Sequence, residues 1–332
     1  MGKNMIRKII LIIVLAVVSV FLLALGIVCT LHIAKRVLRP SIEKTGGTIL
    51  VYEIDTQGLT SKEKEGLTNR MIRILQRRVD PEGMLGLLWR PLGDTRFEVI
   101  MPASSHYSLE DLQRMLKGAG ILEFRILPTL GHPKVDTDEM TRYIEALKEK
   151  GPKYSSDNKY VWCEIENIKE WNLPNSVVAQ FGDKSYVLTS NKENETLLYS
   201  GGDGQRAWKL EEARPSQDGM GRRAIGFTLD DKGGRLFANV TGKNIDRPLC
   251  ILLDEIAISA PTIQSRIYRQ GIITGSFTQV AQDEIVNKLN AGCLPARLVE
   301  QPISVKTIGP SIGTDNLDKG TPTGKKLLKD NN

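Results

Sequence analysis

Two carboxylates and a hydroxyl group lie close together in the segment LCILLDEIAISAP, where Asp254 and Glu255 follow an apolar run and Ser259 comes shortly after. Two carboxylates can act as acid and base, and a serine beside a base can act as a nucleophile. Adjacent residues of a strand and turn point in different directions, however, and no motif connects His106 or His132 with the serine. The segment therefore predicts a solvated hairpin turn, and we assign no catalytic residue.

Other groupings of polar residues are weak signals for a metal or a phosphate. His132 precedes three carboxylates, Asp136, Asp138 and Glu139, but a polar loop explains the same composition. The segment GTPTGKK, residues 320–326, has one residue too few between its glycines for a phosphate-binding loop and no Ser or Thr after its lysines. We predict no metal site and no cofactor site, and the residues that contact a substrate stay unassigned.

The cysteines also lack the spacing of a metal or redox site. Cys163, Cys250 and Cys293 lie in the body of the chain without a C-x-x-C motif, and three cysteines cannot all pair with one another. Cys250 lies within an apolar run, and Cys293 follows a helical pattern. Both are predicted to be small residues of the core.

An apolar segment of 26 residues, 9–34, contains no Asp, Glu, Lys or Arg. Roughly 20 residues suffice to cross the hydrocarbon core of a bilayer. A cleaved signal peptide has a shorter apolar core and ends at a small-x-small cleavage site. The nearest match here, Ala24-Leu25-Gly26, is a poor version of that site, and the apolar run continues past it. We predict a transmembrane helix over residues 9–34 in contact with lipid, residues 1–8 in the cytoplasm, and the body on the other side of the membrane.

The net charge of the chain does not indicate a nucleic-acid partner. The sequence has 45 Lys and Arg residues against 39 Asp and Glu residues, which gives a formal net charge of +6. The first forty positions hold six of these basic residues and no acidic one, so the rest of the chain is balanced. Binding to phosphate backbones requires clustered basic residues, and we therefore exclude a nucleic-acid partner.

The first part of the body alternates strands with helices. Residues 48–55, 96–102 and 121–127 have strand patterns, and the segment LLWRPLG can pair with the second of these as a hairpin. One helix is predicted within residues 61–83, and a second begins at a capping box over residues 108–111. The order β-α-β-β-α-β predicts a ferredoxin-like unit with four strands and two helices. Four arginines lie off the apolar stripe of the first helix and predict a solvated face paired with Glu: Arg70, Arg73, Arg77 and Arg78.

The later part of the body predicts further α+β structure. The pattern loosens from residue 128 to about 219, which indicates an insertion or a second subdomain. Regularity returns with a strand at 224–230, a helix ending near Gly242, and the hairpin of RPLCILLD with IAISAP. Thr278 opens a helix that carries apolar residues on one stripe, and the segment ARLVEQPISVKTIG supplies a final strand.

The segment from RPLCILLDEIAISAP through NAGCLPARL, running into TIGPSIGTDNLDKG, closely resembles the first extracytoplasmic domain of SecD, a membrane subunit of the bacterial Sec protein-export machinery. Earlier segments resemble the same family in the same order, namely GGTILVYEID, RRVDPEG and GILEFRIL. The resemblance covers the apolar segment and nearly all of the body. It is weakest between about 135 and 220.

The resemblance implies an α+β architecture in which a transmembrane helix precedes a ferredoxin-like base with an inserted head. Residues 42–130 and 276–309 would form the base, 131–275 the head, and 310–332 a polar tail. It also implies a translocase subunit of the bacterial inner membrane with no enzymatic activity. Such a subunit assists the export of unfolded polypeptide with a SecF-like subunit and the SecYEG translocon.

The sequence departs from the family pattern in two places. In the family, the segment matching TIGPSIGTDNLDKG leads into a second membrane helix, whereas this chain continues TPTGKKLLKDNN, so we expect that it cannot couple export to protons alone. The family usually has Asp-Gly at the hairpin, where this chain has Asp254-Glu255, and this difference leaves the turn type open. An alternative function is a membrane-tethered scaffold that kept the outer fold of SecD but lost export.

Overall fold

The structure is a computed structural model that describes residues 46–105, 107–171, 173–199, 208–299 and 301–309. The predicted transmembrane helix at 9–34, the cytoplasmic residues 1–8 and the polar tail 310–332 lie outside the described residues. Within these ranges, no helix is both long enough and apolar enough to cross a membrane.

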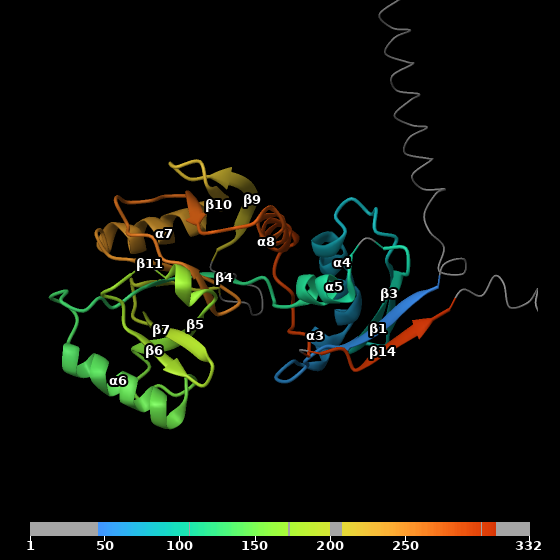
Figure 1. Cartoon of the computed structure of the whole chain (residues 1–332), viewed down its shortest axis with the longest axis horizontal. Coiled ribbons are helices and arrows are strands. Elements are labelled where there is room, and N and C mark those ends of the chain that lie inside the picture. The colour runs from blue at the N-terminus through green and yellow to red at the C-terminus, as the bar shows by residue number, and fades with distance from the viewer. Residues whose placement is uncertain (1–45, 106, 172, 200–207, 300, 310–332) are drawn as a thin grey trace, which may run out of the picture.

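The described residues form two lobes (Figure 1). The small lobe, residues 46–117 and 298–309, contains a four-stranded antiparallel sheet with the order β14-β1-β3-β2. Its strands are β1 (Gly47–Glu53), β2 (Leu88–Leu92), β3 (Arg96–Pro102) and β14 (Ser304–Ile308). Its helices are α3 (Ser61–Lys64), α4 (Leu67–Val79) and α5 (Leu109–Leu116).

Helices α4 and α5 form where the sequence predicts helices. In α4, Leu67, Met71, Leu75 and Val79 are buried at helical spacing. The predicted capping box of α5 is present, because the Ser108 side chain accepts from the Asp111 amide and the Asp111 carboxylate accepts from the Ser108 amide. Both helices pack their apolar residues against Leu50, Phe97 and Val99 of the sheet in one core cluster.

The predicted four-strand unit is wrong in its last strand. Residues 121–127 contain β4 (Leu122–Ile126), which pairs with β11 and β8 in another sheet, and β14 takes the position beside β1. The backbone has a positive φ at Gly118 and Gly120, immediately before β4. An alternating strand pattern predicts a strand and its buried face, but it does not predict which strand lies beside it.

The large lobe, residues 122–291, contains two sheets and three helices longer than one turn. The seven-stranded sheet has the order β6 (Val178–Phe181), β7 (Lys184–Ser190), β5 (Tyr160–Ile165), β12 (Ile256–Ser259), β11 (Leu249–Leu253), β4 and β8 (Thr196–Leu197). The three-stranded sheet has the order β13 (Gln270–Thr274), β10 (Arg223–Leu229) and β9 (Leu210–Gln217). The helices are α6 (Thr137–Lys150), α7 (Asp231–Lys243), α8 (Gln279–Ala291) and the single-turn η1 (Ile168–Glu170).

The main core of the large lobe lies between its two sheets. Phe124 on β4 is at its centre, with ring centroids 5.4 Å from Phe227 and 4.8 Å from Phe237. Burial of one such side chain stabilises the fold by about 1.5–3 kcal/mol. Helix α6 packs against another cluster that includes Tyr160 and Trp162. The core of the large lobe is thus separate from the core of the small lobe.

Helix α8 lies between the two lobes (Figure 1) and is bonded firmly to the large one. The side-chain amide nitrogen of Gln282, Nε2, donates to the carbonyl oxygens of Ser216 (3.1 Å) and Ala224 (2.6 Å). The Asn290 side chain both accepts from and donates to the backbone of Ala213. On its other side, α8 contacts α4 of the small lobe.

Candidate functional site

The Asp254–Glu255 turn joins β11 to β12 and has a positive φ at both residues, 56° and 70°. Two consecutive residues in the left-handed region define a type I′ turn, which matches the twist of a tight hairpin. Glycine adopts this conformation freely, whereas a residue with a side chain does so at a cost of roughly 1–2 kcal/mol. The turn that the sequence left open is therefore the type that Asp-Gly would favour, formed without glycine.

The Asp254 side chain bonds to the segment that enters β4. Its Oδ1 accepts from the backbone amides of Gly120 (2.7 Å) and Ile121 (3.0 Å). The Asp254 amide donates to the Ile121 carbonyl oxygen at 2.9 Å, and Oδ2 lies 3.6 Å from Nζ of Lys288 on α8. The Asp254 side chain is only 16% exposed. The prediction of a solvated turn is therefore wrong for Asp254, because the hairpin packs against a neighbouring chain segment that its own sequence does not reveal.

Glu255 agrees with the predicted solvated turn. Its side chain is 68% exposed, and its Oε1 accepts from Nη2 of Arg297 at 2.6 Å. Arg297 lies on the segment that returns from α8 to the small lobe, so the two carboxylates of the turn contact the two segments that join the lobes. They point to different partners and do not form an acid/base pair.

The segment that donates hydrogen bonds to Asp254, residues 118–121, requires glycine at two positions. At Gly118, φ is 75° and a Cβ atom would lie 2.0 Å from Oδ2 of Asp254. At Gly120, φ is 77° and a Cβ atom would lie 2.8 Å from Nη2 of Arg78. A side chain at either position would meet both a strained backbone and an occupied space. The close approach of the hairpin to this segment depends on both glycines.

Arg78 supports the same segment from α4. Its side chain is 2% exposed and donates to the carbonyl oxygens of Gly118 (2.8 Å) and Ala119 (3.2 Å). Burial lowers its pKa to about 10, although the nearby Asp254 opposes this shift. Arg78 therefore remains charged at neutral pH.

The arginine face of α4 is exposed at Arg73 and Arg77, as predicted, but Arg78 is buried. Within the described residues, the predicted pairing of these arginines with Glu side chains is not found. Arg70 donates to the carbonyl oxygens of Glu63 and Glu65, and Arg77 donates to that of Ala291. The hydrogen bonds run to backbone oxygens and not to Glu side chains. Helical spacing indicates which face is polar but not what that face contacts, and this explains the difference.

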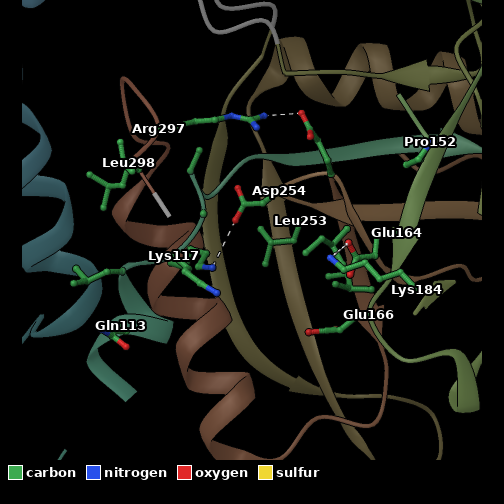
Figure 2. A pocket seen from close by; sticks show the side chains of 18 of the residues that line it. Gln113, Lys117, Pro152, Glu164, Glu166, Lys184, Leu253, Asp254, Arg297 and Leu298 are labelled. Carbon is green, nitrogen blue, oxygen red and sulfur yellow. Dashed lines mark hydrogen bonds and ion pairs between the residues drawn. The ribbon is translucent and has the colours of Figure 1, made fainter. Parts of the chain in front are cut away.

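A cleft of about 790 Å³ lies between the lobes, with the Asp254–Glu255 turn in its wall (Figure 2). Glu164 and Lys184 line the large-lobe side and form an ion pair at 2.7 Å. Lys117 and Leu298 line the small-lobe side. Burial lowers the pKa of Lys288 in the cleft, which the neighbouring Asp254 opposes. The cleft is lined by charged side chains of both signs and by apolar side chains such as Ile256 and Val299.

The remaining sequence candidates lie apart from this cleft. The Ser259 hydroxyl is buried and lies 3.4 Å from that of Thr274. Nδ1 of His132 accepts from the Lys134 amide, and Asp136 caps the start of α6. No three His, Cys, Asp or Glu side chains of the described ranges are grouped so that they could hold a metal ion. His106 and residues 320–326 lie outside the described residues.

The three cysteines of the body lie in different environments. Cys250 is buried as predicted, Cys163 is buried in the same cluster, and burial raises the pKa of both thiols. Cys293 is only partly buried, and its thiol donates to the Gly120 carbonyl oxygen at 3.1 Å. It therefore lies at the junction of the lobes and not in a core as predicted, because the chain leaves α8 at Gly292.

Sequence reasoning missed several residues of this junction: Arg78, Gly118, Gly120, Lys288 and Arg297. The signal for the glycines was present, since two of them stand close together before an apolar strand. Glycines directly after a helical pattern also commonly end a helix, so the pair does not by itself indicate a junction. The basic residues carried no signal, because their partners are distant in the sequence.

Comparisons with a family model and with curated proteins point to the same kind of protein. The family model for the SecDF P1 head subdomain matches residues 186–296. The protein translocase subunit SecD of Elusimicrobium minutum is 28% identical over 296 residues, which cover 86% of this chain and 56% of that protein. The subunit of the same name from Rickettsia felis is 37% identical over 259 residues, which cover 78% of this chain and 42% of that protein.

The chain spans about half the length of the curated relatives it matches. A crystal structure of SecDF in a super-membrane-facing form is similar to 90% of this chain and 36% of its own, with a TM-score of 0.49 and 23% identity. The matches to relatives extend over most of the sequence and confirm the resemblance read from its segments. Most of this chain is similar to SecD-type subunits, and residues 186–296 match the P1 head subdomain of SecDF.

Proposed function

We propose that this chain assists the export of unfolded polypeptide across the bacterial inner membrane as a SecD-type translocase subunit. The observation that carries the proposal is the match of 86% of the chain to proteins named as SecD subunits of the protein translocase. The match to the P1 head model, residues 186–296, lies almost entirely within the large lobe and supports the same role. A SecF-like subunit and the SecYEG translocon would be its partners.

The proposed division of labour follows the two lobes. The strand order β14-β1-β3-β2, with two helices on one face, supports a ferredoxin-like base. We place this base at residues 46–117 and 298–309, because β4 and α8 of the expected ranges 42–130 and 276–309 pack with the large lobe. Residues 131–275 would form the head, which would hold emerging polypeptide by apolar and backbone contacts weak enough to allow release. Residues 9–34 would anchor the chain in the membrane, with both lobes on the extracytoplasmic side.

Photocrosslinking to an exported polypeptide tests this proposal. A photoreactive amino acid replaces Ile272 on β13 of the large lobe, which is 45% exposed, or Leu92 on β2 of the small lobe, which is 42% exposed. The full chain is expressed with its membrane partners, and an exported polypeptide is arrested during translocation. Because the two side chains are about equally accessible, a difference between them reports on the lobe and not on exposure.

We expect crosslinks from position 272 to the arrested polypeptide and few from position 92. We also expect the chain to copurify with a SecF-like subunit. The proposal fails if neither position crosslinks to exported polypeptide while both crosslink to folded envelope proteins. That outcome would support the membrane-tethered scaffold.

A further inference from the structure

The junction between the two lobes is polar, although each lobe has its own apolar core. Contacts across the junction are hydrogen bonds and ion pairs, such as Arg77 with the Ala291 carbonyl oxygen and Arg114 with Glu284 at 2.7 Å. An exposed ion pair such as that of Arg114 with Glu284 contributes only about 0–1 kcal/mol to stability. The apolar cores therefore stabilise each lobe but do little to fix the angle between the lobes.

Within the described residues, the chain passes between the lobes at two places, 117–121 and 292–297. Three glycines on these segments have positive φ: Gly118, Gly120 and Gly292. Glycine offers the least resistance to backbone rotation, so the covalent connections alone would leave the lobe angle poorly defined. Other contacts must therefore hold the angle between the lobes.

The hairpin of the large lobe contacts both connecting segments at once. Asp254 binds the amides of Gly120 and Ile121 on the first segment, and Glu255 binds Arg297 on the second. The segments also bond to each other, since the Leu294 amide donates to the Ala119 carbonyl oxygen at 2.8 Å. Of the two side-chain contacts, those of Asp254 are better shielded from water than that of Glu255, since the Asp254 side chain is 16% exposed and the Glu255 side chain 68%. Hydrogen bonds to a charged acceptor are the strong kind.

We propose that Asp254 is the positioning residue that fixes the angle between the lobes, and with it the width of the cleft. Its carboxylate holds the first connecting segment against the hairpin, and it interacts electrostatically with Lys288 on α8 and with Arg78 on α4. Loss of the carboxylate would leave the amides of Gly120 and Ile121 without their acceptor and would leave both cores intact. The inference concerns the arrangement of the lobes and does not rest on the proposed export role.

The test measures the distance between the lobes in the full chain in detergent micelles. Spin labels are attached to genetically encoded non-natural amino acids that replace Asp94, in the β2–β3 turn of the small lobe, and Glu145, on α6 of the large lobe. Both residues are exposed. Pulsed electron paramagnetic resonance gives the distance distribution between them. Hydrogen exchange at the amides of Gly120 and Ile121 reports directly on the bonds to Asp254.

Substitutions on the same turn provide matched variants. For Asp254→Ala we expect a broader, shifted distance distribution and exchange at both amides at least about tenfold faster, the factor that 1.4 kcal/mol produces. Glu255→Ala removes a carboxylate and one ion pair from an equally strained position, and it should leave both readouts unchanged. Asp254→Asn keeps an acceptor oxygen but not the charge, and should retain the distance of the parent.

A second pair of variants displaces the carboxylate without deleting it. Gly118→Ala places a Cβ atom 2.0 Å from Oδ2 of Asp254, whereas Gly93→Ala, also at a positive φ, meets nothing within 4 Å. We expect Gly118→Ala to change the distance distribution as Asp254→Ala does, and Gly93→Ala to leave it unchanged. Protection of the core amides of β1 and β11 verifies that each variant is folded.

The inference is overturned if Asp254→Ala keeps the distance distribution of the parent, or if Glu255→Ala changes it equally. Should Asp254→Ala fail to fold, Gly118→Ala decides in its place, and an unchanged distribution in that variant also overturns the inference. None of these outcomes depends on crosslinking to exported polypeptide, so the inference and the proposed function can fail separately.

Discussion

The two residues of the β11–β12 turn share a left-handed backbone but differ in what their side chains do. In Glu255→Gly, relief of about 1 kcal/mol of backbone strain is offset by the greater freedom of glycine in the unfolded chain and by loss of an exposed ion pair. We expect a stability within about 0.5 kcal/mol of the parent in urea unfolding. Asp254→Gly relieves the same strain but removes the shielded bonds to Gly120 and Ile121, and should cost about 2 kcal/mol. Equal effects of the two substitutions would contradict this.

Arg78 and Arg73 lie on the same helix, α4, and both were predicted to lie on its solvated face. Arg78→Ala leaves the carbonyl oxygens of Gly118 and Ala119 without their donor and opens a cavity, so we expect a loss of about 3 kcal/mol. Arg73 is exposed, and Arg73→Ala should change stability by less than about 0.5 kcal/mol. Denaturant unfolding of the two variants side by side measures the difference. Similar losses would mean that burial of Arg78 does not matter.

At the scale of single elements, the start of α5 should be sensitive to acid. Hydrogen bonds from the side chain and backbone of Ser108, and then from Arg114, lower the pKa of Asp111. The folded pKa lies below that of the unfolded chain, so the carboxylate stabilises α5 above the ordinary pKa of 3.8, and this contribution is lost as the pH falls through the lowered pKa.

Ser108→Ala tests this cap. We expect the variant to lose about 1 kcal/mol at neutral pH and to show a weaker pH dependence of amide exchange in α5 at acidic pH. Helix α6, whose cap is Asp136, serves as the internal control because Ser108 does not contact it. An unchanged acid response of α5 would show that the capping box does not control it.

Elements were predicted more accurately than their partners. The sequence indicated α4, α5, α8 and the β11–β12 hairpin, since each shows its apolar period or cap within a few residues. It did not indicate that β4 leaves the four-stranded sheet, because partner choice depends on contacts with strands more than 100 residues away. The hydrogen bonds of Gln282 to Ser216 and Ala224 could not be predicted for the same reason, because in the sequence a buried polar residue beside an apolar stripe looks like a solvated one.

At the scale of the whole molecule, two apolar cores joined by a polar junction should unfold in two steps. Phe124→Ala removes the central ring of the large-lobe core and should cost about 3–5 kcal/mol there, and Leu75→Ala should cost about 2–5 kcal/mol in the small lobe. Hydrogen exchange along a urea series, with β10 and β3 as the respective probes, separates the two effects.

Helix α8 decides between two ways of dividing the molecule. Its bonds to β9 and β10 are buried or partly buried, whereas it contacts α4 and α5 through the bond of Arg77 to the Ala291 carbonyl oxygen and the exposed pair of Arg114 with Glu284. The amides of α8 should therefore lose protection together with β10 in Phe124→Ala and keep it in Leu75→Ala. That result would make α8 part of the large lobe mechanically, even though the family resemblance implies that residues 276–309 belong to the base. If both substitutions lowered the protection of β3, β10 and α8 equally, the two lobes would be one cooperative unit, and a carboxylate at their junction could not set an angle between them.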